Sequence, residues 1–148
     1  MPVYTTGIMK YSRRELSLLL PALAAAQSSG RPTPLPSQAL RYQDLTPTKN
    51  GALASRQMLK GDTHTGFQID LHESELAAGQ APHEPHRHVH EEMLLMREGE
   101  VELTLNGKTT RLGPGSVAFF ASNDLHGWRN PGTAAAHYFV LALGTDDK

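Results

Sequence analysis

The sequence predicts an all-β fold, a small barrel or jelly roll, in the larger C-terminal part of a 148-residue chain. From Thr65 onward, short runs of apolar residues alternate with polar ones, which is the period of a half-buried strand. Glycine, proline and asparagine separate these runs at close intervals, and Asn106-Gly107 is a strong signal for a two-residue hairpin. The length suits one domain with its own core.

The strands are expected in order along the chain, each ending at turn residues. In the first, Phe67, Ile69 and Leu71 alternate with polar residues and predict one buried face. The others are expected at residues 93–97, 101–105, 108–112, 116–120, 126–129 and 134–143. This many short strands without a helical repeat predict a single all-β domain.

The first 39 residues differ in composition from the rest and predict an N-terminal extension, helical or disordered. Residues 1–26 contain Arg13-Arg14, a short apolar run and small residues, an arrangement that resembles a twin-arginine export leader. An N-terminal helix capped by Ser12 is the alternative. Residues 27–39 have the proline-rich composition of a linker, so the folded domain is expected over residues 40–148. A cleaved leader implies a periplasmic or exported protein without a membrane anchor; without a leader the protein is expected in the cytoplasm.

Charge and cysteine content exclude several classes of function. The chain has 14 Lys and Arg against 15 Asp and Glu, so no basic surface for nucleic acid or anionic membrane is expected. The absence of cysteine excludes disulfides, thiolate catalysis and zinc-thiolate sites. Eight histidines, four of them between residues 83 and 90, favour a metal site because histidine is the commonest side-chain metal ligand.

The spacing of His86 and His88 suits metal binding. Residues i and i+2 of a strand point to the same face, so both imidazoles can reach one ion. Glu92 follows with a possible oxygen ligand, and His126 lies far along the chain, followed by Asn130. Ligands drawn from separate strands would form a site that only the folded domain completes.

These spacings resemble the cupin family over residues 67–143. The first cupin motif is approximately G-x5-H-x-H-x3,4-E-x6-G, and the matching residues are Gly79, His86, His88, Glu92 and Gly99, with Gly79 one residue too far upstream. The second is approximately G-x5-P-x-G-x2-H-x3-N; His126 and Asn130 match it, and Asn123-Asp124 replaces its P-x-G. The resemblance implies a metal site formed by His86, His88, Glu92 and His126.

The resemblance also implies one divalent transition metal ion, with Mn, Fe, Ni, Cu, Co and Zn all compatible with nitrogen and carboxylate ligands. His90 has the same parity as His86 and His88 and is an alternative ligand, although a bend after His88 would turn it away. His90, His83 and Glu91 are the candidate acid/base groups. His83 lies just before the motif, at the expected mouth of the barrel.

Three functions remain open for a small-molecule substrate: a metal-dependent dioxygenase-like oxidoreductase, an isomerase or lyase that uses the ion as a Lewis acid, and a non-catalytic binding module. A homodimer is expected because lone cupins usually pair. Met93 and Leu95 are expected to face a partner or a second sheet, on the side opposite Leu94 and Met96, which are expected to line the cavity.

Three other histidines have structural interpretations. His64 and His72 are expected on the surface. His137, on the last strand, is expected either as a hydrogen-bonded core residue or as a proton shuttle in the pocket. Phe120 and Trp128 are expected in the core or in the wall of the pocket.

Overall fold

The computed structural model describes residues 33–144, so the leader predicted at residues 1–26 lies outside the described residues and stays a prediction. The unit that begins at Pro34 contains a short 3-10 helix, η1 (Tyr42–Asp44), and nine strands within the described range. The strands are β1 (Thr48–Asn50), β2 (Leu53–Asp62), β3 (Gln68–Leu76), β4 (Glu91–Glu98), β5 (Val101–Leu105), β6 (Lys108–Leu112), β7 (Val117–Phe120), β8 (His126–Arg129) and β9 (Ala136–Leu143). Over these residues no helix is long and apolar enough to cross a membrane.

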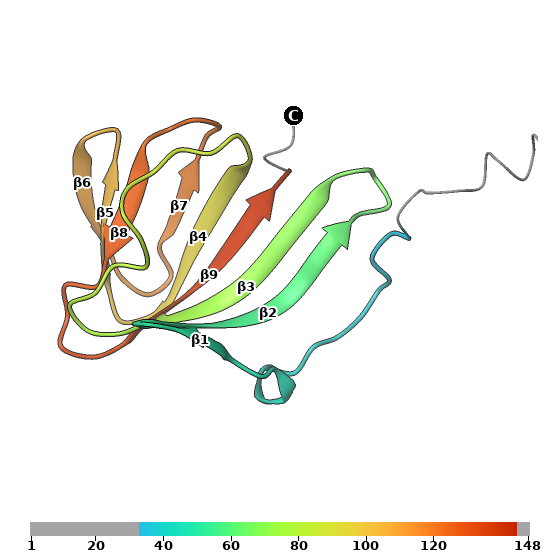
Figure 1. Cartoon of the computed structure of the whole chain (residues 1–148), viewed down its shortest axis with the longest axis horizontal. Helices are drawn as coiled ribbons and strands as arrows, with labels where there is room; N and C mark the ends of the chain where they lie inside the picture. Colours follow the sequence, from blue (N-terminus) through green and yellow to red (C-terminus); the bar gives the residue numbers. More distant parts are fainter. Residues whose placement is uncertain (1–32, 145–148) are drawn as a thin grey trace, which may run out of the picture. The chain divides into compact units, whose positions relative to one another are not determined.

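The strands form two antiparallel sheets that face each other (Figure 1). The larger sheet has the order β1-β2-β3-β9-β4-β7 and the smaller one the order β6-β5-β8. The predicted all-β jelly-roll class is confirmed, with the qualification that the sheets form a sandwich rather than a closed barrel.

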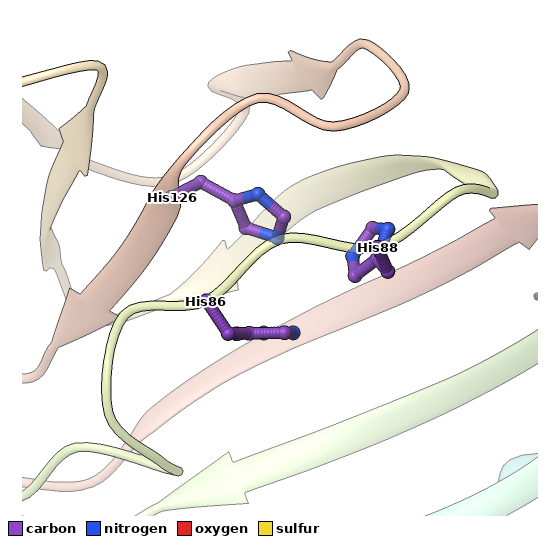
Figure 2. A group of neighbouring side chains, drawn as sticks. All are labelled: His86, His88 and His126. Carbon is purple, nitrogen blue, oxygen red and sulfur yellow. The ribbon is translucent and has the colours of Figure 1, made fainter.

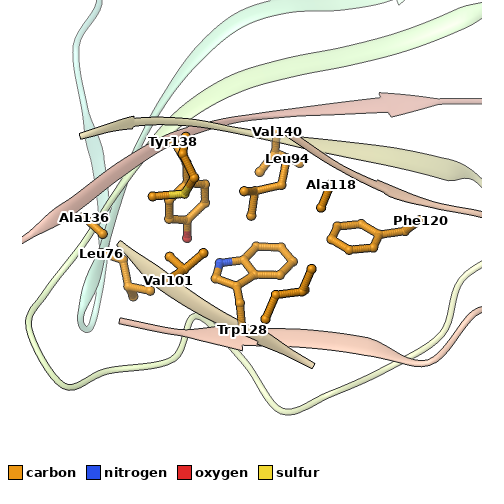
Figure 3. Close-up of a cluster of buried hydrophobic side chains, with 11 residues drawn as sticks. Leu76, Leu94, Val101, Ala118, Phe120, Trp128, Ala136, Tyr138 and Val140 are labelled. Atoms are coloured by element: carbon orange, nitrogen blue, oxygen red, sulfur yellow. The ribbon is translucent and has the colours of Figure 1, made fainter. Parts of the chain in front are cut away.

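Alternating side chains of both sheets fill the space between them (Figure 3). Leu94 and Met96 of β4 pack there against Val101 of β5 and Tyr138 of β9, and Trp128 of β8 lies beside them. Each fully buried side chain of this size contributes roughly 1.5–3 kcal/mol of hydrophobic stabilisation. Leu94 and Met96 share the face of Glu92, as their parity indicated, and pack in the core cluster.

The sequence pattern predicts no strand before residue 67, but the structure has two there, β1 and β2. The ten-residue β2 pairs with β3, and the register shifts between Gln57 and Leu59. That bulge breaks the period of two, and the polar and small residues of β2 have low strand propensity. The position of β2 is therefore set by its pairing with β3, and its own sequence does not predict it.

A charged network covers one end of the outer face of the large sheet. Glu73 of β3 is fully buried there and contacts Arg56 Nη1 at 3.1 Å, Arg97 Nη1 at 3.5 Å and His137 Nδ1 at 3.0 Å. The Tyr42 hydroxyl donates to Glu73 at 3.3 Å, and the guanidinium groups of Arg56 and Arg97 lie 4.7 and 4.8 Å from the Tyr42 ring centre. The network attaches η1 to the sheet.

The other end of this outer face is apolar and open. Leu95, Val117 and Phe119 are 36%, 57% and 47% exposed, and the register places Leu95 beside Val117 and Met93 beside Phe119. Among residues 33–144, no second sheet covers these side chains. Met93 and Leu95 were expected to face either a second sheet or a partner subunit. The prediction that remains is the partner subunit.

Candidate metal centre

The loop of residues 77–90, between β3 and β4, brings two histidines against β8. His86 and His126 form an isolated antiparallel bridge, so His86 lies on a loop and not within a strand. The loop can approach this closely because β8 has a glycine at the crossing point: a Cβ on Gly127 would lie 2.9 Å from the Cα of Pro85. Sequence spacing indicated the two histidines, but the loop, not strand parity, brings them together.

Three imidazole rings surround one region between this loop and β8 (Figure 2). One ring nitrogen from each of His86, His88 and His126 lies within 4.8 Å of the others. The ring centres are 5.2 Å apart for His86 and His88, 5.0 Å for His86 and His126, and 4.7 Å for His88 and His126.

Glu92, on β4 of the opposite sheet, adds a buried carboxylate to this group. Its Oε2 lies 3.6 Å from His88 Nε2, and its Oε1 lies 3.9 Å from His126 Nε2. The four residues implied by the cupin resemblance therefore come together, drawn from a loop, one strand of the large sheet and one strand of the small sheet.

Hydrogen bonds to backbone carbonyls orient two of the rings. His126 Nδ1 lies 2.9 Å from the Asp124 oxygen, and His88 Nδ1 lies 2.8 Å from the His90 oxygen. Because a carbonyl only accepts, each Nδ1 carries the hydrogen and donates it. In a neutral imidazole this leaves Nε2 with the lone pair that a metal ion needs.

Burial sets the protonation of the group. It lowers the pKa of His86, with the neighbouring His83 and His88 acting in the same direction, and it also lowers the pKa of His126. Burial raises the pKa of Glu92 to about 7, and His90 opposes that rise. The site thus favours neutral imidazoles and disfavours an isolated carboxylate, so a bound cation would compensate both effects.

The donor atoms of this group could hold a metal ion. His86 Nδ1, His126 Nε2 and Glu92 Oε1 are buried and have no hydrogen-bond partner among the described residues. Buried polar atoms rarely remain unsatisfied, and a cation bound by these donors would satisfy them. Imidazole nitrogens and one carboxylate suit a divalent transition metal, and they do not distinguish among the six candidates.

The candidate acid/base residues lie at different distances from this group. His90 does not turn away: its ring stacks on that of His88 at 3.7 Å, and its Nε2 lies 3.8 Å from Glu92 Oε2. His88, His90 and Glu92 therefore form a second, overlapping ligand group. His83 is exposed, but its ring centre lies 4.2 Å from that of His86.

Glu91 is the one candidate that the structure does not bring to the group. It is exposed, and as the neighbour of Glu92 on β4 it points to the opposite face of the sheet. Strand parity alone could have indicated this, because Glu92 was already expected to point inward.

Two further histidines and the motif asparagine have defined places. His137 hydrogen-bonds Glu73 on the outer face, which removes the proton-shuttle alternative. His72, expected on the surface, is half-buried and lines a cavity beside Glu92. Asn130 donates through Nδ2 to the Leu76 and Ala134 carbonyls. It therefore stabilises the loop after β8 and is not one of the candidate metal ligands.

Comparisons with known proteins agree with this architecture. Residues 72–142 match the family model described as "Cupin domain". Among solved structures, an RmlC-like cupin from Shewanella frigidimarina is 16% identical with a TM-score of 0.64, covering 76% of this chain and 95% of its own. The polyketide cyclase RemF from Streptomyces resistomycificus is 20% identical with a TM-score of 0.63, covering 76% and 82%.

A predicted oxalate decarboxylase from Thermotoga maritima is 18% identical with a TM-score of 0.64, covering 73% of this chain and 100% of its own. At these identities the likeness concerns the fold. No curated protein matches the sequence. The family match over residues 72–142, the two facing sheets and the cluster of His86, His88, His126 and Glu92 agree: the chain has the cupin fold.

Proposed function

We propose that this protein is a metal-dependent oxidoreductase of the dioxygenase kind that acts on a small, oxygen-rich or enolic substrate. The observation that carries the proposal is the group of His86, His88, His126 and Glu92, three nitrogens and one carboxylate oxygen. Four protein ligands leave coordination positions of a six-coordinate ion for substrate atoms.

A divalent transition metal bound here supplies a Lewis acid and, if it is redox active, a route for electrons to dioxygen. The protein's own part is to hold the ligands in place and limit water. Carbonyl hydrogen bonds fix the His88 and His126 rings, and Phe120 stacks on the His126 ring at 4.2 Å, covering one of its faces. His83 is exposed beside His86 and is the group placed to exchange a proton with solvent.

The position of His83 also favours a second candidate, an isomerase or lyase that uses the same ion without redox chemistry. The two solved neighbours named for a reaction, a polyketide cyclase and a predicted oxalate decarboxylase, show that the fold carries different activities. Oxygen consumption distinguishes the two candidates, because the oxidoreductase consumes dioxygen and the isomerase or lyase does not.

The test begins with the metal content of the protein purified without a histidine tag, followed by an oxygen electrode screen against catechols, flavonoids and diketones. The proposal expects about one equivalent of a redox-active metal and oxygen uptake that His126→Ala abolishes. His64→Ala, at an exposed histidine away from the site, is the matched control and should retain both. Turnover without oxygen uptake would favour the isomerase or lyase, and metal binding without turnover would favour a non-catalytic module.

A further inference from the structure

A cavity of about 230 Å³ lies between Glu92 and the hydrophobic core. Besides Glu92, its polar lining comprises His72 and Ser74 on β3, His83 on the loop before β4, Trp128 on β8 and Tyr138 on β9. The volume exceeds that of a few water molecules and is below the range of most drug-sized ligand sites, so it suits a compact molecule.

Two of these side chains hold buried polar groups that the protein itself leaves unsatisfied. Trp128 and Tyr138 are 6% and 1% exposed, and neither the Trp128 Nε1 nor the Tyr138 hydroxyl has a hydrogen-bond partner among the described residues. Figure 3 shows the indole nitrogen on the side of the Tyr138 hydroxyl. An acceptor atom of a ligand that reaches both groups from the cavity could receive a hydrogen bond from each.

The chemistry of both groups specifies the kind of atom they bind. An indole N–H only donates. Burial raises the pKa of Tyr138 to about 12, against the opposing effect of the Trp128 N–H, so the phenol keeps its proton at neutral pH and can also donate. The matching ligand atom is therefore an acceptor oxygen.

The rest of the lining argues that this oxygen is uncharged. None of the described residues that line the cavity is a lysine or an arginine. Ser74 is neutral and lies 3.0 Å, Oγ to Oγ, from Ser55, and burial lowers the pKa of His72. His83 also lines the cavity but is exposed to solvent, whereas a carboxylate beside the buried Trp128 and Tyr138 groups would have no lysine or arginine to pair with and would share the cavity with Glu92, which is costly.

We propose that Trp128 and Tyr138 form a specificity subsite that binds a neutral carbonyl or hydroxyl oxygen of the substrate and selects against a second carboxylate there. The substrate class is thus a small molecule with one metal-binding oxygen group and one neutral oxygen further along. This inference rests on the proposed function, because the first group is taken to bind at the metal centre.

Three carboxylates of similar length test the subsite on the metal-loaded protein. Levulinate has a ketone away from its carboxylate, pentanoate has a methylene there and succinate has a second carboxylate. Two hydrogen bonds predict that levulinate binds about tenfold more tightly than pentanoate, with succinate weaker than levulinate, by titration calorimetry. Trp128→Phe and Tyr138→Phe each keep a ring while removing a donor, so each should lower the preference for levulinate several-fold and leave pentanoate affinity unchanged.

Tyr42→Phe, which removes a tyrosine hydroxyl on the outer face of the large sheet, is the matched control and should keep the levulinate preference. Metal affinity is measured separately for every variant and should equal that of the wild type. If the wild type binds no metal, the proposed function fails and this inference fails with it. If metal binds but levulinate does not bind, is not preferred over pentanoate or succinate, or keeps its preference in both variants, the subsite alone is overturned.

Discussion

His86 and His126 exchange two backbone hydrogen bonds, from His86 N to His126 O at 2.9 Å and from His126 N to His86 O at 3.1 Å. This bridge joins the loop before β4 to β8 and so sets the spacing of two ligands of the proposed metal centre. The bridge needs a close backbone approach, which makes the next residue on β8, Gly127, the position most sensitive to added volume.

Gly127→Ala should therefore weaken metal binding without touching a ligand. The new Cβ would lie 2.9 Å from Pro85 Cα and about as close to the Pro85 ring, which has little freedom to move. Displacing the loop should lower metal affinity at least tenfold and cost about 1–3 kcal/mol of stability. Gly113→Ala is the matched control, because nothing lies within 4 Å of a Cβ there. Equal metal affinity in both variants, measured by competition with a chelator, would contradict this role for Gly127.

The sequence predicted the site better than it predicted the sheet around it. The strands at Val101–Leu105, Lys108–Leu112 and His126–Arg129 have the predicted bounds, because glycine and asparagine turns mark their ends. Strand β2 left no such pattern, since its bulge and its polar residues hide the period of two. Its position is determined by pairing with β3, which is a tertiary contact.

In the site, too, local sequence patterns predicted some features, while others depend on tertiary contacts. The resemblance of the motif spacing to cupins implied His86, His88, Glu92 and His126 as ligands, but the sequence could not give the ring stacking that keeps His90 beside His88. The buried contacts of Glu73 were also beyond the sequence, because its partners Tyr42, Arg56, Arg97 and His137 come from four separate segments. No short motif encodes such a network.

Glu73→Gln should destabilise the fold through that network. The substitution keeps the shape but removes the charge that faces two guanidinium groups, so Arg56 and Arg97 lose their shared buried partner. Because both arginines are partly exposed, the expected loss is about 1–3 kcal/mol in urea unfolding, below the range for a fully buried pair. Glu75→Gln, on the same strand and face, should change stability by less than about 0.5 kcal/mol. Equal effects of the two changes would refute the importance of the network.

Tyr138 predicts a loss of stability at alkaline pH. Its folded pKa of about 12 lies above the ordinary value of 10.0, so the folded state holds the phenolic proton more tightly than the unfolded chain. The resulting stability is complete below pH 10 and is lost as the pH rises toward 12. Between pH 9 and pH 11 the wild type should lose about 1 kcal/mol more than Tyr138→Phe. The free energy of unfolding is measured in urea across this pH range for both proteins. If it falls equally in the two, the Tyr138 hydroxyl is not the cause of the alkaline loss of stability.

The open outer face leads to a prediction about assembly, and we propose that two copies pair through it. Leu95, Val117 and Phe119 form an apolar surface there, and η1 covers only the opposite end of the face, at Glu73. Two identical patches can meet around a twofold axis without like-charge repulsion because these side chains carry no charge. Phe119→Glu should raise the dimer dissociation constant at least tenfold in sedimentation equilibrium, since it places two carboxylates in the interface. Thr110→Glu, on an exposed position of β6 in the other sheet, should leave the dimer intact. A wild-type protein that is monomeric, or a dimer that Phe119→Glu does not weaken, would rule out this face as the interface.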